Sequence, residues 1–406
     1  MNICIFEDFL ISNLAPLNYL RHTSKLICGV YTLQEKILNY FPAKTKLTLH
    51  SRKYLAEYLR EKFPKACVNE LRESDYIFLN SRVLFSKHDL KNIVKLFKKE
   101  KNSALLQSKN IIAFNTSADN TEKFKEIINP DTDNLIAFSD IEWLGLNKIE
   151  TNDFKVINYP SDLILYNEDE LNYDLKNPAK KKLYISAKAK VSKQVSFDTS
   201  KGNIYIDKNA VIEPFTYIKG PVYIGEGTLL RSGTKLYGPV RIGGLCKVSG
   251  EITNSILHWY VNKQHLGFLG HSYLCEWVNL GAGTTTSNLK NNYSNISLNI
   301  NGDEVNTNSI FLGSIIGDHT KTGIQTMLNT GTIIGISSNL YGAGFHNKLV
   351  KSFSWTDASA NQTKVYELSK ALSTAKISMT RREAEMTKSY EDMFTCVFNN
   401  KDELFV

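Results

Sequence analysis

The sequence predicts an α/β domain, followed by a parallel β-helix of six-residue repeats and a short helical tail. Up to residue 175, short apolar runs such as YIFLN and NIIAFN alternate with helical patterns, as in α/β domains. From Leu183 onward, aliphatic residues recur at every sixth position, which indicates a solenoid. After Trp355 the repeat stops and a helical periodicity begins.

The length of 406 residues exceeds one ordinary core, and we expect domains at 1–175, 176–357 and 358–406. No apolar run approaches the roughly 18 residues of a membrane-spanning helix, and the N-terminus lacks the basic start of a signal peptide. We therefore expect a cytoplasmic protein. The six cysteines show no metal-like spacing, so they predict reduced thiols and no particular metal site.

The net charge of +8 comes largely from Lys-rich stretches such as KNIVKLFKKEKN. Nucleic-acid binding would require basic motifs interleaved with aromatic residues, and the sequence contains none. We therefore expect anionic small molecules as partners instead, such as sugar phosphates, nucleotides or coenzyme A.

The repeat is the strongest pattern in the chain. Each hexad of such a solenoid forms one short strand and one turn, and its aliphatic residue points inward onto its neighbours. The aliphatic positions are Ile206, Ile212, Ile218, Ile224, Leu230, Leu236, Ile242 and Val248. The register resumes at Phe268, Leu274, Leu280, Ile310, Ile316, Thr322, Leu328, Ile334 and Leu340.

Three segments flank or interrupt the repeat. Residues 285–309 are polar and Asn-rich, which predicts an excursion from the solenoid of the kind that often builds binding sites. The hydrophilic stretch NEDELNYDLKNPAKKK predicts a linker in front of the repeat. The tail, with apolar residues at Val365, Leu368 and Leu372, predicts helices that cap the open end of the solenoid.

The segment HLGFLGHSYLCEWVNLGAGTTTSN resembles the acetyltransferase core of the bifunctional UDP-N-acetylglucosamine pyrophosphorylase/glucosamine-1-phosphate acetyltransferase family. Residues 262–270, 275–282, 287–293 and 352–355 resemble motifs of a divergent branch of that family. The resemblance covers the whole repeat and, more weakly, the N-terminal half. It implies a nucleotidyltransferase-like first domain, a left-handed β-helix, and a homotrimer whose acceptor sites lie between neighbouring solenoids.

The resemblance also implies roles for individual residues. His265 matches the general base that takes a proton from an amine as it attacks the acetyl-CoA thioester. The matched sugar and sugar-phosphate contacts are Asn279, Arg231 and, by its proximity to the base, Lys263. The matched acetyl-CoA contacts are Ala282, Asn288 and Ser314. His271 is the alternative base, whereas His258, His319 and His346 are expected to be turn or surface residues.

The repeat departs from the family at two points. Phe268 replaces a tyrosine, and the E-M-K-K run before the catalytic histidine is only approximated by Lys247 and Glu251. These departures leave the identity of the amino sugar open.

The N-terminal half retains fewer of the family's motifs. Phe6-Glu7-Asp8 follows the first strand in place of a Gly-rich phosphate loop. Arg21 and Lys36 match basic positions of the divergent branch, which implies nucleotide binding, while surface ion pairs remain the alternative. The better-known relatives bind Mg²⁺ through an aspartate where this chain has Asn80, a poor ligand for a hard cation.

Three functional hypotheses follow. The first is acetyl transfer to an amino-sugar phosphate by the β-helix, with or without Mg²⁺-dependent nucleotidyl transfer by the first domain. The second is a sugar-1-phosphate nucleotidyltransferase whose β-helix only assembles the trimer. The third is a non-catalytic scaffold that binds a sugar nucleotide or a partner.

Overall fold

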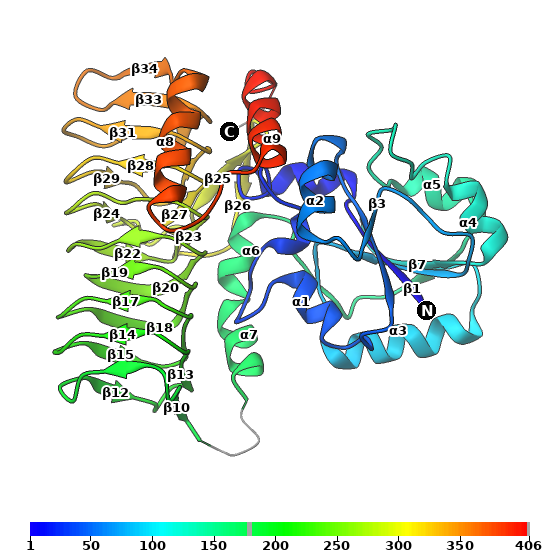
Figure 1. The fold of residues 1–406 in the computed structure, drawn as a ribbon, viewed down its shortest axis with the longest axis horizontal. Helices are drawn as coiled ribbons and strands as arrows, with labels where there is room; N and C mark the ends of the chain where they lie inside the picture. The colour runs from blue at the N-terminus through cyan, green and yellow to red at the C-terminus, as the bar shows by residue number, and fades with distance from the viewer. Residues whose placement is uncertain (177–180, 404–406) are drawn as a thin grey trace.

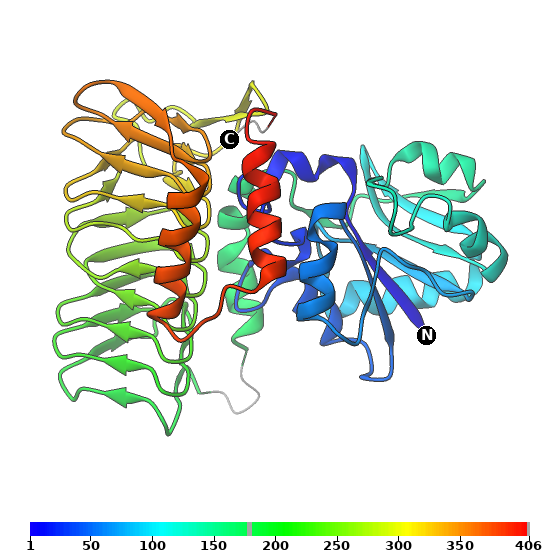
Figure 2. The same cartoon turned by 45° about the horizontal axis from the view of Figure 1, so that its top comes forward.

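The computed structural model describes residues 1–176 and 181–403. An α/β half and a long solenoid lie side by side, and α6 (Pro160–Leu165), α7 (Asn167–Asp174) and α9 (Lys388–Asn399) lie between them (Figures 1 and 2). The predicted order of α/β domain, β-helix and helical tail is therefore confirmed. Among the described residues, no helix has the length and apolarity to cross a membrane.

The N-terminal half is built on a seven-stranded sheet. Its order is β3 (Cys67–Val68), β2 (Lys46–His50), β1 (Asn2–Phe6), β4 (Tyr76–Asn80), β7 (Asn110–Thr116), β6 (Ser103–Gln107) and β8 (Asn147–Glu150). Its other helices are α1 (Leu33–Leu38), α2 (Ala56–Lys62), α3 (Lys87–Lys99), α4 (Ala118–Phe124) and α5 (Phe138–Trp143). Alternate residues of β1 pack into different apolar clusters, because helices cover both faces of the sheet.

The solenoid has three parallel sheets. The first sheet contains β10 (Leu183–Ile185), β13 (Ile204–Ile206), β16 (Val222–Ile224), β18 (Lys235–Ile242), β20 (Glu251–Leu257), β23 (Tyr273–Leu274), β27 (Ser314–Ile316), β30 (Thr332–Ile334) and β32 (Leu349–Val350). The second contains β11 (Lys190–Val191), β14 (Val211–Ile212), β17 (Leu229–Leu230), β19 (Lys247–Val248), β21 (Asn262–Lys263), β28 (Lys321–Thr322), β31 (Asn339–Tyr341) and β33 (Ser354–Asp357). The third contains β12 (Ser196–Asp198), β15 (Tyr217–Lys219), the first parts of β18 and β20, β22 (Phe268–Gly270), β24 (Thr285–Thr286) and β29 (Met327–Leu328).

The six-residue register is confirmed over its first part, because all eight aliphatic positions from Ile206 to Val248 are buried in one core. The prediction is wrong at Phe268. A register shift in the β18–β20 pair shortens one coil, so Leu236 aligns with Ile252, and Ile252 with Leu269. Leu269 is therefore the inward residue, while Phe268 is only half-buried.

The excursion follows β24 and returns to the solenoid at β27. It contains a hairpin of β25 (Ser297–Ile300) and β26 (Asp303–Asn306). Leu298 and Ile300 pack into the apolar core shared by the two halves, so this hairpin reinforces the junction. Ile310, expected inside the solenoid, belongs to this excursion and is 38% exposed.

Two expectations about the flanking segments are wrong. The first half of the hydrophilic stretch expected as a linker is helix α7, which contacts β18 and β20, whereas residues 177–180 lie outside the described residues. The tail helices do not cap the open end. Instead α8 (Leu368–Thr380) lies along the solenoid, and just after it Arg382 bonds to the Leu245 carbonyl, several coils from that end.

The outer face of the first sheet joins the two halves. Ile256, Tyr273 and Ile315 occupy one column of this face and pack against Leu17 and Leu26 of the N-terminal half.

Within this junction, the buried guanidinium of Arg21 forms an ion pair with Asp318 of the solenoid. It also donates to the Leu17 carbonyl at 2.8 Å and to the Cys275 sulfur at 3.1 Å. Burial lowers the pKa of Arg21, but Asp318 outweighs it and raises that pKa, so the guanidinium stays charged. Burial raises the pKa of Asp318 to about 6, although Arg21 opposes this effect.

Lys263 is a basic residue at an inward position of the solenoid core, where the neighbouring inward residues are apolar. It pairs with Val248 in the ladder, at an inward position, and is 2% exposed. Its ammonium donates to the His265 carbonyl at 2.7 Å, and burial lowers its pKa to about 8. This hydrogen bond ties the Lys263 side chain to the turn that carries His265.

Replacing Arg21 with Met should lower the free energy of unfolding by about 3–5 kcal/mol, because Asp318 would be left buried and unpaired. Adding Asp318→Asn should restore part of the loss, which denaturant unfolding in a double-mutant cycle measures. The control is Arg60→Met at the exposed Glu57 pair, where we expect less than about 1 kcal/mol. Equal effects at both arginines would contradict the assigned role of the pair.

The stability difference between the wild type and Lys263→Met should depend on pH. The folded pKa of Lys263 is about 8 and the ordinary value is 10.5, so the unfolded chain binds this proton more tightly. Wild-type stability should therefore rise relative to the variant as pH increases through this window, by on the order of 3 kcal/mol. Unfolding midpoints at both ends of the window measure the change, and a pH-independent difference would refute it.

Candidate acyl-transfer site and the N-terminal ion pairs

The turn between the second and third sheets, here called the second–third corner, carries three of the predicted site residues, each in a different coil. His265 is exposed in the turn after β21, and its imidazole has no hydrogen-bond partner among residues 1–176 and 181–403. Ala282 lies one coil above it, where the Gly283 amide donates to the Leu266 carbonyl at 3.1 Å. Arg231 lies two coils below, paired with Glu213 at 3.2 Å and still partly exposed.

Asn279 and Lys263 lie on opposite sides of the solenoid wall. Asn279 forms bridges to Asn262 and Lys321 and points outward, because the neighbouring Leu280 is buried in the core. The outer surface beside the corner is therefore polar at Asn279. The Lys263 ammonium, which the sequence suggested as a phosphate contact, points inward and does not reach this surface.

The remaining predicted residues gather at the turn between the third and first sheets, the third–first corner. The Asn288 amide donates to Nδ1 of His271 at 2.8 Å, and the His271 ring stacks on Phe311 at 5.0 Å. Ser314 is buried one coil higher, and its hydroxyl lacks a partner among the described residues. Burial lowers the pKa of His271 to about 4, so this imidazole is neutral and its Nδ1 lone pair already accepts a bond. It is thus a poorer general base than His265.

One side of the solenoid separates the two corners. Strand β22, Phe268–Gly270, runs from the His265 turn to the His271 turn. Three residues of strand cover about 10 Å. A single chain therefore does not bring His265 together with Asn288 or Ser314.

Both basic residues predicted to bind nucleotide are held by internal carboxylates. Arg21 pairs with Asp318, as described above. The Lys36 ammonium donates to Glu170 at 2.8 Å and to Asp174 at 2.7 Å, which ties α1 to α7. These are buried structural pairs, unlike the surface pairs considered as the alternative.

The ends of β1 and β4, where Mg²⁺ would be expected, hold two further closed ion pairs. Glu7 accepts bonds from Arg52 and Thr23. Burial raises the pKa of Glu7, but these partners outweigh it and lower that pKa to about 2. Asp8 accepts from Asn80 at 2.8 Å and from Arg82 at 2.6 Å.

These residues do not fit a Mg²⁺ site. Asp8, Asn80 and Arg82 are all buried, and each nitrogen of the Arg82 guanidinium already donates to an internal acceptor. Mg²⁺ needs free oxygen ligands and keeps several waters. In the described parts of the chain, no three His, Cys, Asp or Glu residues group as metal ligands.

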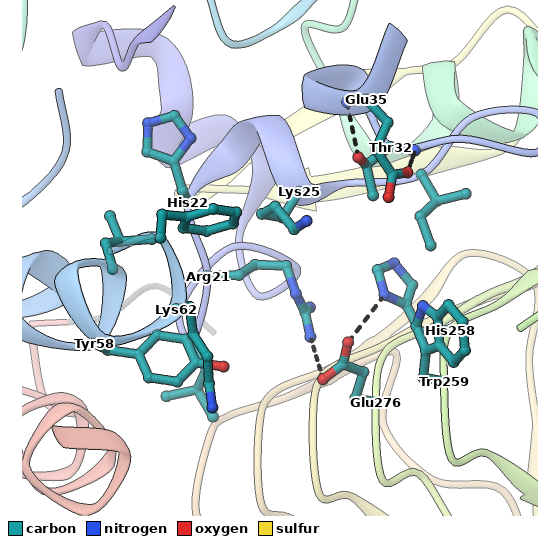
Figure 3. A pocket seen from close by; sticks show the side chains of 14 residues that line it. Arg21, His22, Lys25, Thr32, Glu35, Tyr58, Lys62, His258, Trp259 and Glu276 are labelled. Carbon is teal, nitrogen blue, oxygen red and sulfur yellow. Dashed lines mark hydrogen bonds and ion pairs between the residues drawn. The ribbon is translucent and has the colours of Figure 1, made fainter. Parts of the chain in front are cut away.

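Sequence reasoning missed a polar group between the two halves (Figure 3). The Tyr273 hydroxyl lies 2.7 Å from Nε2 of His258 and accepts from the Ile27 amide at 2.9 Å. Nδ1 of His258 faces Glu276 at 3.8 Å. His258, His319 and His346, expected in turns or at the surface, are all buried, with exposed fractions of 1%, 1% and 4%, although His319 does lie in a turn. Glu276 could have been found, since it lies within the 275–282 motif.

Comparison with known proteins agrees with this architecture. Residues 3–182 match the family model described as "Sugar nucleotidyl transferase". The chain is 35% identical over 150 residues to a "Bifunctional sugar-1-phosphate nucleotidylyltransferase/acetyltransferase" of Sulfurisphaera tokodaii, covering 36% of this chain and 37% of that protein. It is 38% identical over 95 residues to a "Bifunctional protein GlmU" of Methanococcus vannielii, covering 23% of this chain and 22% of that protein.

The chain thus spans well under half the length of these relatives. A solved Francisella novicida UDP-N-acetylglucosamine acyltransferase covers 50% of this chain and 72% of its own, at 12% identity and a TM-score of 0.28, too low to support an argument. The family match coincides with the α/β half and ends just before the first strand of the solenoid. The chain therefore carries a sugar nucleotidyl transferase family domain over residues 3–182, followed by a parallel β-helix.

Proposed function

We propose that this protein is a transferase of sugar-nucleotide biosynthesis whose β-helix moves an acetyl group from acetyl-CoA to the amine of an amino-sugar phosphate. The observation that carries the proposal is the exposed, unpartnered imidazole of His265 at the second–third corner, between Arg231 and Ala282. The relatives named as bifunctional nucleotidylyltransferase/acetyltransferase and GlmU support the same chemistry.

The reaction requires a base at the attacking nitrogen. A neutral His265 takes the proton of the amine as the nitrogen attacks the thioester carbonyl. The tetrahedral intermediate then collapses, the C–S bond breaks, and the coenzyme A thiolate leaves as the amide forms. Arg231 holds the sugar phosphate and Asn279 the sugar, with Arg231 about 10 Å below His265 at two coil spacings.

The third sheet supports assembly of the chain into a homotrimer. The N-terminal half covers the first sheet, and α8 packs near the edge of the second. Beside the third sheet, Leu266 is 72%, Ile324 75% and Phe345 59% exposed, an apolar surface that a second copy would cover. Leu266 and Ile324 lie at the second–third corner and Phe345 beside the third sheet, so a neighbouring copy seated on this surface would bring its Asn288 and Ser314 toward His265.

Replacing His265 with Ala should reduce kcat for acetyl transfer by about 10²–10⁴-fold, because the base is lost while acetyl-CoA still binds. Calorimetric titration with acetyl-CoA checks that binding is kept, which also excludes a scaffold without a coenzyme A site. Wild-type acetyl transfer by the His265→Ala variant would refute the mechanism.

Mixing subunits tests the shared site. Neither His265→Ala nor Asn288→Ala homo-oligomers should be active, but refolding them together should restore part of the activity, since some interfaces then combine two intact corners. His88→Ala, an exposed histidine of the N-terminal half, is the matched control and should stay active alone. Sedimentation should report three copies, and a fully active monomer would contradict the proposal.

Nucleotidyl transfer is the second candidate, favoured by the family match over residues 3–182. The closed pairs of Glu7 with Arg52 and of Asp8 with Arg82 argue against it. We expect no pyrophosphate release from UTP or dTTP with Mg²⁺ and a panel of sugar 1-phosphates. Pyrophosphate release by the wild-type protein would establish this candidate instead.

A further inference from the structure

The first coil of the solenoid, residues 181–202, leaves its inward side chains partly exposed. Four of them pair with inward residues of the next coil: Leu183 with Ile204, Ile185 with Ile206, Val191 with Ile212, and Phe197 with Ile218. The second-coil partners are at most 1% exposed, whereas Ile185 is 38% exposed. Because stacking of coils is what buries such positions, this end of the solenoid presents an apolar centre to solvent.

Figure 1 places this end far from the other elements of the tail. Strands β10 and β12 lie at the lower end of the solenoid, and the hairpin of β33 and β34 (Gln362–Val365) lies at the opposite end. The first coil is also several coils from the two corners of the proposed acyl-transfer site. Its surface is therefore separate from that site.

The first coil is strongly basic. Residues 181–202 contain six lysines and a single acidic residue, Asp198. All six lysines are exposed, and none lies within ion-pair distance of a carboxylate among residues 1–176 and 181–403. The Asp198 carboxylate lies 3.5 Å from the Lys219 ammonium of the next coil and accepts from the Tyr217 hydroxyl at 3.2 Å. Asp198 therefore does not neutralise the lysines of its own coil.

The lysines surround the apolar centre, and we call them the basic ring. Lys188 lies in the turn between β10 and β11, Lys193 in the turn between β11 and β12, and Lys201 in the bend after β12. Lys190 points outward from β11, because the neighbouring Val191 faces the core. Every corner of the coil thus carries at least one free ammonium group.

We propose that this end of the solenoid docks on an anionic lipid surface. The basic ring would contact the charged headgroups, and the partly exposed Ile185 would lie among them. Strands β10, β11 and β12 each pair with one neighbouring strand, so their outer edges need water or headgroup oxygens as hydrogen-bond partners. The end therefore stays in the polar headgroup layer and does not enter the hydrocarbon.

Charge favours a lipid surface over a second copy of the chain at this end. Two first coils facing each other would bring like charges together, which opposes association. An anionic bilayer complements all corners at once, because a lysine ammonium binds as a point charge without a fixed geometry. In the proposed homotrimer, three-fold symmetry would place three such ends on one side and strengthen the contact. The docking itself depends neither on the trimer nor on acyl transfer.

Co-sedimentation of the full-length protein with lipid vesicles tests the docking. We expect binding to vesicles that contain phosphatidylserine, little binding to pure phosphatidylcholine, and release by high salt. The combined variant Lys188→Gln, Lys190→Gln and Lys193→Gln should weaken binding at least about tenfold. The matched control is Lys348→Gln, Lys351→Gln and Lys364→Gln, which removes the same charge from exposed lysines at the opposite end of the solenoid. This control should bind as the wild type does.

Three results would each overturn the proposal: equal binding to phosphatidylcholine, wild-type binding by the first-coil variant, or equal loss of binding in the control. Binding to poly-glutamate without binding to the vesicles would also overturn it, in favour of an acidic protein partner. Both combined variants should keep the wild-type unfolding midpoint, because the replaced side chains are exposed. His265→Ala should bind vesicles normally, so a failure of the acyl-transfer proposal would leave this result unchanged.

Discussion

The buried pair of Arg21 and Asp318 is the interaction on which the arrangement of the two halves depends. The first sheet of the solenoid presents an apolar outer column that has to be covered, and the N-terminal half covers it. Apolar contact alone does not determine a register between two surfaces. An ion pair buried in the interface determines this register, because any shift would leave two charges buried without partners. The pair therefore gives the junction one arrangement.

Buried ion pairs between internal partners also occur elsewhere in the N-terminal half. Lys36, which the family resemblance associates with nucleotide, pairs with Glu170 and Asp174. Asp8, which follows the first strand in place of a phosphate loop, pairs with Arg82. A phosphate or Mg²⁺ would have to displace these partners and leave them unpaired in a buried site. These charged groups are therefore part of the buried core of the N-terminal half.

The sequence predicts those parts of the architecture that depend on residues close together in the chain. A hexad repeat needs only its own spacing, so the inward positions from Ile206 to Val248 follow directly. The shortened coil that moves the inward position from Phe268 to Leu269 depends on a shift in strand pairing, which leaves no periodic signal. Partners such as Arg21 and Asp318 are hundreds of residues apart, and spacing does not predict contacts over that separation. The corner with His265 was predicted from a motif, whereas the contacts of Glu276 and Tyr273 with the N-terminal half arise only when the halves meet.

The first and second sheets of the solenoid are largely covered, which leaves the third sheet and its corners for the proposed acyl-transfer site. The first sheet is buried under the N-terminal half, and α8 packs near the second. The third sheet keeps Phe345 and its neighbours exposed, and its two corners carry His265 on one side and Asn288 on the other. Since one side of the solenoid separates these corners, one copy alone would supply only half of the proposed acyl-transfer site at each corner. Association through the third sheet would bury the apolar surface and complete the sites in the same step, so assembly and catalysis would depend on one surface.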